Sequence, residues 1–260
     1  MMVNENICCC TADIVCIESN LDEIIPVPRN SVYSRYIKRI IDFSLSLIGV
    51  VVLSPLLLVL TVLELIYHGR PVLYVTLRPG KDEKLFNLYK FRSMTNESAE
   101  DGELLPEKYR LTKFGKFLRA TSLDELPSLF NIIKGDLAII GPRPLLTDYL
   151  ELYPQRYRYR HSVRPGLELS PPAGRLYFLT WREQFENDIS YVENVSFTLD
   201  VKQLYLILKM ILSPKNNKVR TDDTRVMFDG TNIDDTRSKR EYLMARSQSV
   251  KESNGNTLAG

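Results

Sequence analysis

Two adjacent carboxylates, Asp124 and Glu125, lie in the stretch RATSLDELPSLFN at positions 119–131. Such a pair suits phosphoryl transfer, because one carboxylate can attack phosphorus directly while the other holds Mg²⁺ together with substrate phosphates. The same residues also fit a purely structural role. Ser122 and Glu125 match a capping box, and acidic side chains suit the positive end of a helix. Pro127 tolerates only an early helical position, so either interpretation puts the pair at or near a helix's first turn.

Arginine lies beside a rigid proline turn at three places: Arg78-Pro-Gly, Gly141-Pro-Arg143-Pro and Arg164-Pro-Gly. A guanidinium held by a rigid turn is well suited to binding phosphate. Any one of these could equally be a surface turn with an incidental arginine, but three in one chain favour phosphate binding. The carboxylate pair and these arginines together indicate chemistry on a phosphate.

Several other kinds of site are absent from the sequence. It contains no GxxxxGK[ST], GxGxxG, GxSxG or HExxH motif, and it has only 2 histidines, His68 and His161. Catalysis by a Ser or Cys nucleophile is therefore not expected. The segment RYRYRH at 156–161 interleaves basic and aromatic residues, but the net charge of only +2 argues against a nucleic-acid-binding protein.

The 4 cysteines, Cys8, Cys9, Cys10 and Cys16, all lie near the N-terminus. Their spacing closes no sensible disulfide loop, and without a nearby histidine a zinc site is not expected. We interpret them as free thiols in a reducing compartment, with lipidation of the three consecutive cysteines as the alternative.

An apolar run, FSLSLIGVVVLSPLLLVLTVL, occupies residues 43–63 and contains no charged residue. About 20 apolar residues suffice to cross a bilayer, and the run begins too far from the N-terminus for a signal peptide. A buried helix of a soluble protein is an alternative. Both flanks are basic, unlike the one-sided charge of a spanning helix. Ser54-Pro55 predicts a kink, so a kinked spanning helix and a re-entrant helix that returns to the same face both remain compatible with the sequence.

Composition divides the chain into four parts: a flexible extension at 1–34, the membrane segment at 35–69, a globular body at 70–212 and a polar, loosely ordered tail at 213–260. Alternating or β-branched runs predict strands at 73–77, 85–91 and 137–140. Helical patterns occur at 107–120, 123–134, 145–160, 181–188 and 199–212. The first of these is basic and amphipathic, which suits either an anionic membrane surface or a core helix with a solvated basic edge. The predicted fold class is α/β, mostly helical with a small β-sheet.

These motifs resemble those of the small bacterial polyprenyl-phosphate phosphoglycosyltransferases, the bacterial sugar transferase family. The resemblance covers about residues 36–212 and rests on these stretches: KRIIDFSLSLIG (38–49), LSP (53–55), RPGKDEKLFNLYKFRSM (78–94), RLTKFGKFLRATSLDELPSLFNIIKGDLAIIGPRPL (110–145), HSVRPG (161–166) and SYVENVSFTLDVK (190–202). The SLDELPxLFNxxKGDxxxxGPRP block is highly specific. The resemblance implies a monotopic protein on the cytoplasmic face of the bacterial inner membrane. Its membrane helix would break at Ser54-Pro55 and re-enter, and Lys38 and Arg39 would anchor at lipid headgroups.

The resemblance also implies a reaction. Members of the family move a sugar phosphate from a UDP-sugar to undecaprenyl phosphate, release UMP, use Mg²⁺ and form a covalent intermediate. Asp124 would then be the nucleophile, and Glu125 would hold Mg²⁺. Four basic residues would bind substrate phosphates: Lys90, Arg119, Arg143 and Arg175. The expected partners are the donor, the acceptor and the bilayer, without nucleic acid; downstream glycosyltransferases and a second copy of the chain are further candidates.

One stretch departs from the family. After Arg-Pro-Gly, members usually continue ITGWAQVNGRN, whereas this chain reads LELSPPAGRL at 167–176, and Arg175 matches only across a one-residue gap. That loop lies near the donor site in the family, so its change affects the expected recognition of sugar and nucleotide. A non-catalytic member that scaffolds a glycan-assembly complex is therefore the alternative to an active transferase. Neither the sugar nor the polysaccharide follows from the sequence.

Overall fold

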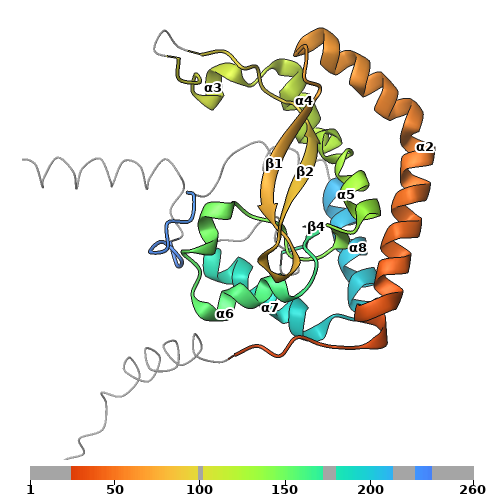
Figure 1. The fold of residues 1–260 in the computed structure, drawn as a ribbon, viewed down its shortest axis with the longest axis vertical. Helices are drawn as coiled ribbons and strands as arrows, with labels where there is room; N and C mark the ends of the chain where they lie inside the picture. Colours follow the sequence, from red (N-terminus) through yellow and green to blue (C-terminus); the bar gives the residue numbers. More distant parts are fainter. Residues whose placement is uncertain (1–24, 99–101, 172–179, 213–225, 236–260) are drawn as a thin grey trace, which may run out of the picture.

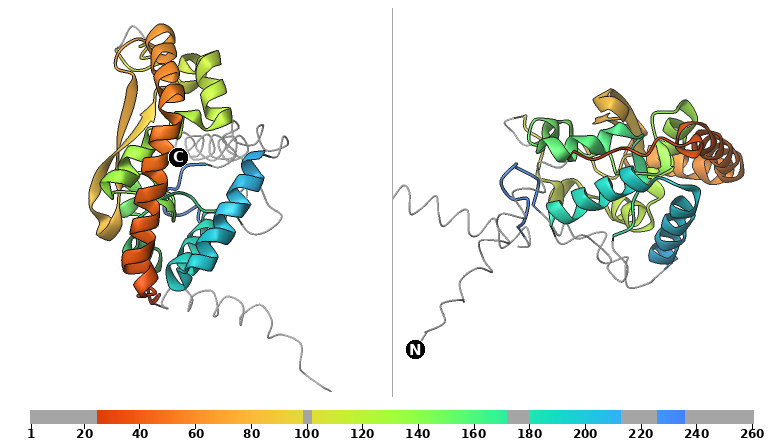
Figure 2. Two further views of the ribbon diagram at one scale, coloured as in Figure 1. Left: turned by 90° about the vertical axis from the view of Figure 1, so that its right-hand side faces the viewer. Right: turned by 90° about the horizontal axis from the view of Figure 1, so that it is seen from below.

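The computed structural model describes residues 25–98, 102–171, 180–212 and 226–235. A long helix, α2 (Lys38–Tyr67), curves along one side of the molecule, and a β-hairpin lies at the centre of the body beside it (Figure 1). Helix α5 (Ser128–Lys134) packs between the hairpin and α2. Helix α8 (Phe197–Leu212) begins near the start of α2 (Figure 2), and its Ile207 packs on the body in an apolar cluster with Ile140 and Tyr191.

Helix α2 follows a short π-helical segment, Tyr33–Ile37, and runs without interruption through Pro55. The helix-break-helix expected at Ser54-Pro55 is therefore wrong as a break in helical structure. Proline removes the hydrogen bond that would reach the carbonyl of Val51, four residues earlier. The Ser54 hydroxyl donates to that carbonyl at 2.8 Å, and this bond helps the helix to continue.

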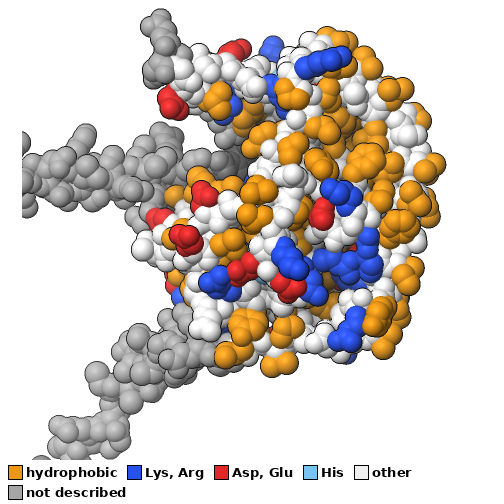
Figure 3. Space-filling model, in the orientation of Figure 1, with side chains coloured by type: hydrophobic (Ala, Val, Ile, Leu, Met, Phe, Trp, Pro, Cys, Tyr) orange, Lys and Arg blue, Asp and Glu red, His pale blue; other side chains and the backbone are white. Residues whose placement is uncertain are grey.

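The surface of α2 is inverted relative to that of a soluble helix. Buried positions on α2 are mostly polar or charged: Lys38, Asp42, Ser46 and Glu64, together with Leu60. The outward positions carry Ile, Leu and Val side chains, such as Val52 at 69% exposure, and apolar side chains gather along this edge of the molecule (Figure 3). Only 11% of the most apolar window is buried, so α2 does not fit the core helix of a soluble protein.

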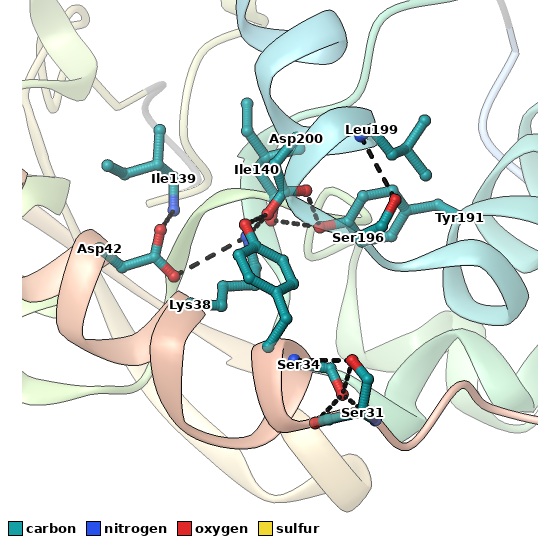
Figure 4. Close-up of polar contacts among 11 residues, drawn as sticks. Ser31, Ser34, Lys38, Asp42, Ile139, Ile140, Tyr191, Ser196, Leu199 and Asp200 are labelled. Carbon is teal, nitrogen blue, oxygen red and sulfur yellow. Dashed lines mark hydrogen bonds and ion pairs between the residues drawn. The ribbon is translucent and has the colours of Figure 1, made fainter.

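Both ends of α2 pack on the same body. At its start, Lys38 pairs with Asp200 of α8 at 2.7 Å, and Asp42 accepts a hydrogen bond from the backbone N–H of Ile139 (Figure 4). At its end, Leu60 packs with Phe91 and Leu118 in an apolar cluster. His68, the residue after α2, is hydrogen-bonded to Glu64 and to Thr112, which caps helix α4 (Lys113–Thr121).

The hairpin consists of β1 (Leu73–Pro79) and β2 (Leu85–Phe91), paired antiparallel with Arg78 opposite Phe86 and Tyr74 opposite Lys90. The second edge of β2 is bound by side chains of α5. Asn131 accepts from the N–H of Tyr89 and donates to the carbonyl of Asn87, and Ser128 donates to the carbonyl of Tyr89. These bonds fix α5, and the turn before it, against the strand that carries Lys90.

A second, parallel pair consists of β3 (Ala138–Ile140) and β4 (Gly166–Glu168). The segments after β3 and at β4 meet at two glycines, Gly141 and Gly166. A Cβ on Gly166 would lie 2.1 Å from the backbone nitrogen of Gly141, so the close approach admits no side chain there. This contact positions the Gly141-Pro-Arg143-Pro turn.

The remaining helices are α3 (Glu107–Arg110), α6 (Gln155–Arg158) and α7 (Trp181–Asn194). An aromatic cluster joins α7 to the segment 147–157 and includes Phe228, which is 3% exposed. Trp181 also donates to the carbonyl of Val226. Residues 226–235, which we assigned to a loosely ordered tail, therefore pack as part of the body.

The predicted strands are found, with β1 two residues longer than expected. The predicted helix at 107–120 is two helices, α3 and α4, and the one at 145–160 is mostly short 3₁₀ turns around α6. Helix α4 buries Leu118, at 0% exposure, while the neighbouring Phe117 is 52% exposed. Helix α4 thus packs on the end of α2 through one face and leaves an aromatic ring outward.

Candidate active site

Asp124 and Glu125 lie in a 3₁₀ turn, Leu123–Glu125, between α4 and α5. The capping-box interpretation is wrong. Ser122 ends α4 in the left-handed conformation, with φ of 57°, and its side chain makes no capping hydrogen bond to this turn. Helix α5 begins only at Ser128, with Pro127 as its N-cap residue, so the carboxylates precede the helix rather than occupying its first turn.

Glu125 is held by two cations. Lys90 Nζ lies 2.7 Å and Arg143 Nη2 lies 2.6 Å from the same atom, Glu125 Oε1. Burial raises the pKa of a carboxyl, but here the charges and hydrogen bonds of Arg143 and Lys90 outweigh burial and lower the pKa of Glu125 to about 2. Glu125 is therefore ionised at every physiological pH.

Asp124 has the opposite environment. Burial, followed by the negative charge of Glu125, raises its pKa above the ordinary value, against weaker opposition from Lys90, Arg143 and Arg119. Within the described residues no donor makes a hydrogen bond or ion pair with this carboxylate. Two neighbouring carboxylates thus differ in basicity and in availability, which is the pattern of groups with separate chemical roles.

Both the side chain and the backbone of Arg143 are held by hydrogen bonds. Its Nη1 donates to the carbonyl of Leu167 at 3.1 Å and to Glu168 Oε2 at 2.9 Å. Its own carbonyl accepts from Arg160, which is 2% exposed and paired with Asp188 at 2.6 Å. The guanidinium thereby bridges Glu125 and Glu168, and its pKa is raised chiefly by these two carboxylates.

A cavity of about 720 Å³ opens over the carboxylate pair. This volume lies in the range of ligand pockets. Three acidic side chains line it, namely Asp124, Glu125 and Glu168, against six basic ones, namely Arg78, Lys90, Arg92, Arg110, Arg119 and Arg143. The excess of basic side chains favours an anionic ligand. A smaller cavity of about 100 Å³ adjoins it and shares Arg78, Lys90, Glu125 and Arg143.

The structure brings together five of the site residues expected from the sequence: Lys90, Arg119, Asp124, Glu125 and Arg143. Arg119 belongs to the last turn of α4 and donates from Nε to the Ser93 hydroxyl at 2.9 Å. Arg175 lies outside the described residues.

The two residues expected at lipid headgroups contact the body. The ammonium of Lys38 is buried in its ion pair with Asp200, so a headgroup anchor does not fit its geometry. Arg39 donates to the carbonyls of Ile132 and Ile133, two carbonyls in the last turn of α5 that would otherwise lack a hydrogen-bond donor from within the helix. Both cations join α2 to the rest of the body.

A divalent cation is compatible with the carboxylate pair. Lys90 and Arg143 share Oε1 of Glu125, which leaves Oε2 as the oxygen that these cations do not occupy. Among the described residues no group of three or more acidic, His or Cys side chains is placed to hold a metal ion. Mg²⁺ is commonly bound by one or two carboxylates plus substrate phosphates, so the pair fits a site that the substrate completes.

Two residues of this cavity were missing from the expected site. Arg78 was noted only as one of three arginine turns, and the sequence could not show that its buried Nε makes no hydrogen bond within the described part of the chain. Glu168 belongs to the loop that departs from the family, and the sequence analysis treated that loop as a loss of recognition residues. A signal was available, because the departure also introduces a carboxylate two residues after Gly166.

Comparisons with known proteins give a family match and several relatives. The family model "Bacterial sugar transferase" matches residues 33–214. The "Uncharacterized sugar transferase EpsL" of Bacillus subtilis (strain 168) is 39% identical over 195 residues, which are 75% of this chain and 96% of that relative.

Two further relatives have names that state an activity. The UDP-N-acetylgalactosamine-undecaprenyl-phosphate N-acetylgalactosaminephosphotransferase of Aeromonas hydrophila is 34% identical over 75% of this chain and 47% of its own length. The UDP-glucose:undecaprenyl-phosphate glucose-1-phosphate transferase of Klebsiella pneumoniae is 35% identical over 65% of this chain and 38% of its own length. The chain therefore spans less than half of each of these two proteins.

Proposed function

Because the chain belongs to the bacterial sugar transferase family, we propose that it transfers a sugar phosphate from a UDP-sugar to undecaprenyl phosphate, releases UMP and thereby begins the assembly of a polysaccharide or glycoconjugate. One observation carries the proposal. A basic cavity contains two adjacent carboxylates, of which Glu125 is locked by two cations and Asp124 has no donor among the described residues. The names of the Aeromonas and Klebsiella relatives support the donor and acceptor classes.

In the first step the Asp124 carboxylate attacks the β-phosphorus of the donor. A P–O bond forms to Asp124, and the bond between the β-phosphorus and the oxygen bridging to the α-phosphate breaks, so that UMP leaves with both bond electrons. The raised pKa of Asp124 makes its carboxylate a stronger nucleophile once ionised. An oxygen of undecaprenyl phosphate then attacks the same phosphorus, restores free Asp124 and forms the lipid diphosphate sugar.

The basic residues of the cavity stabilise the negative charge of the phosphates. Arg119 is proposed to contact a substrate phosphate. Lys90 and Arg143 act chiefly on Glu125, whose position and ionised state they maintain. Mg²⁺ bound through Glu125 would neutralise charge on the diphosphate during transfer. Arg175 remains a further proposed phosphate ligand, carried over from the resemblance.

The packing of α2 supports a monotopic arrangement on the cytoplasmic face of the inner membrane. A helix of 30 residues is about 45 Å long, enough to cross the hydrocarbon core. A spanning helix would separate its two ends by the bilayer, yet both ends of α2 contact one body, at Asp200 and at Thr112. The outward apolar face suits contact with lipid while both ends stay on one side.

Release of UMP from a panel of UDP-sugars, with undecaprenyl phosphate and Mg²⁺ present, tests the proposal. Wild-type protein is expected to release UMP with at least one donor, and Asp124→Asn is expected to release none. Normal turnover by Asp124→Asn would refute the nucleophile assignment. Folded wild-type protein that is silent across the panel would favour the scaffold alternative suggested by the altered loop at 167–176.

A further inference from the structure

Arg78 differs from the other basic side chains of the cavity, because it has no protein partner among the described residues. Its Nε is fully enclosed, yet it makes no hydrogen bond. The other cations bind protein groups: Lys90 and Arg143 bind Glu125, Arg92 binds the Pro71 carbonyl, Arg110 binds the Leu105 carbonyl, and Arg119 binds the Ser93 hydroxyl. Arg78 is thus the cavity cation that these protein contacts leave uncompensated.

Such a charge is costly in the free protein. Burying a cation without a carboxylate or carbonyl partner removes water contacts and replaces them with nothing. Burial of Arg78, together with the positive charge of nearby Arg143, lowers its pKa below the ordinary value of arginine, although it stays protonated. An anion that enters the cavity would relieve this cost.

The backbone holds Arg78 rigidly. The residue lies near the end of β1, in register with Phe86, and is followed by buried Pro79 and Gly80. Gly80 donates from its N–H to the carbonyl of Lys84, and a Cβ on Gly80 would lie 2.9 Å from that oxygen. The guanidinium is therefore carried beside the tightly closed turn of the hairpin, and little ordering is left to occur when a ligand binds.

Arg78 also lies where the site needs a cation. It lines both cavities, beside Lys90, Glu125 and Arg143, which are common to the two. Lys90 and Arg143 are engaged by Glu125, so they have limited capacity for a second anion. We propose that Arg78 binds the diphosphate of the nucleotide-sugar donor. This inference rests on the proposed function and adds to it a phosphate ligand on the hairpin.

The test compares Arg78→Gln and Arg78→Lys with wild-type protein in detergent, with UDP as the probe and without acceptor. Loss of a charge-assisted hydrogen bond predicts that Arg78→Gln weakens UDP binding about ten- to a hundredfold. Arg78→Lys keeps the charge without the planar fork and is expected to lie between the two. Binding of uridine, which has no phosphate, is expected to stay unchanged.

A second readout separates ligand binding from a structural role. Because the charge is uncompensated, ligand-free Arg78→Gln is expected to melt at or above the wild-type temperature, while its stabilisation by UDP shrinks. Arg164→Gln is a matched control. Arg164 is also partly buried and makes no side-chain hydrogen bond to the residues that the structure describes, and burial lowers its pKa, but it lines neither cavity. Its removal is expected to leave UDP affinity unchanged.

Three results would overturn the assignment: wild-type UDP affinity in Arg78→Gln, a lower melting temperature of that variant without ligand, or a defect confined to the KM for polyprenyl phosphate. UDP binding is measured without turnover, so its outcome is distinct from that of the proposed function. If wild-type protein transfers sugar phosphate and Arg78→Gln binds UDP as tightly as wild type, only this inference is refuted. UDP binding that depends on Arg78, in a protein that transfers no sugar, would refute only the reaction.

Discussion

Replacing Lys90 with methionine tests the electrostatic description of Glu125. The pKa of Glu125 is about 2 instead of 4.5, and at about 1.4 kcal/mol per pKa unit the difference is worth roughly 3 kcal/mol. Lys90 and Arg143 contact the same carboxylate oxygen, so we assign about half of this, roughly 1.5 kcal/mol, to Lys90. The Glu125 side chain is 23% exposed, so solvent screens the pair only in part.

Lys90→Met is therefore expected to lower the melting temperature at pH 7 by about 3–6 °C. Because the pKa of Glu125 is lowered by folding, its stabilising contribution is complete above about pH 4.5 and is lost as pH falls toward 2. The difference between wild type and variant should shrink over the same interval. Thermal unfolding of detergent-solubilised protein, followed at several pH values, gives the measurement.

Two comparisons make this prediction specific to the pair. Lys134→Met removes a cation that is 55% exposed and 3.8 Å from Asp136, and it should cost under about 0.5 kcal/mol. In a Glu125→Gln background, Lys90→Met should cost much less than it does in wild type. Equal losses in both backgrounds would show that Lys90 stabilises the protein through some contact other than Glu125, and the reasoning would fail.

Three further outcomes follow from the same contacts. Asp124→Asn should raise the melting temperature at pH 7. Folding raises the pKa of the Asp124 carboxyl, so its ionised form destabilises the folded protein, and the neutral amide removes that cost. A lower melting temperature would contradict this. Gly166→Ala should destabilise by about 3 kcal/mol by denaturant titration, while Gly49→Ala, whose new Cβ meets Leu129 at an ordinary 3.7 Å, should not. With the native cysteines replaced, single cysteines before and after α2, at positions 36 and 70, should react with an impermeant maleimide from the same side of the membrane. Labelling from opposite sides would instead mean that α2 spans the bilayer.

Much of the fold could be predicted because the signals were local. Residues 85–91 alternate in the manner of a strand, and the apolar run at 43–63 needs no tertiary information. Strand β4 could not be predicted, since Gly166–Glu168 is three residues long and exists only because two glycine backbones meet.

The position of the carboxylate pair could be predicted from the sequence, but the local backbone conformation and the charged partners of the pair could not. Ser122 has the right type and spacing for a helix N-cap, yet α4 ends on it in the left-handed conformation, and its side chain makes no capping hydrogen bond to the 3₁₀ turn that follows. The distinct environments of Asp124 and Glu125 arise from Lys90 on β2 and from Arg143 after β3. Those contacts depend on how α5 is bound to β2, which no short stretch of sequence encodes.

The most direct test of the central claim is the mass of the protein after incubation with a UDP-sugar and Mg²⁺ in the absence of acceptor. The proposed chemistry predicts an adduct of one sugar phosphate on a peptide that contains Asp124, lost on addition of undecaprenyl phosphate and absent from Asp124→Asn. An active protein that forms no adduct, or one whose adduct lies on a residue other than Asp124, would contradict the claim.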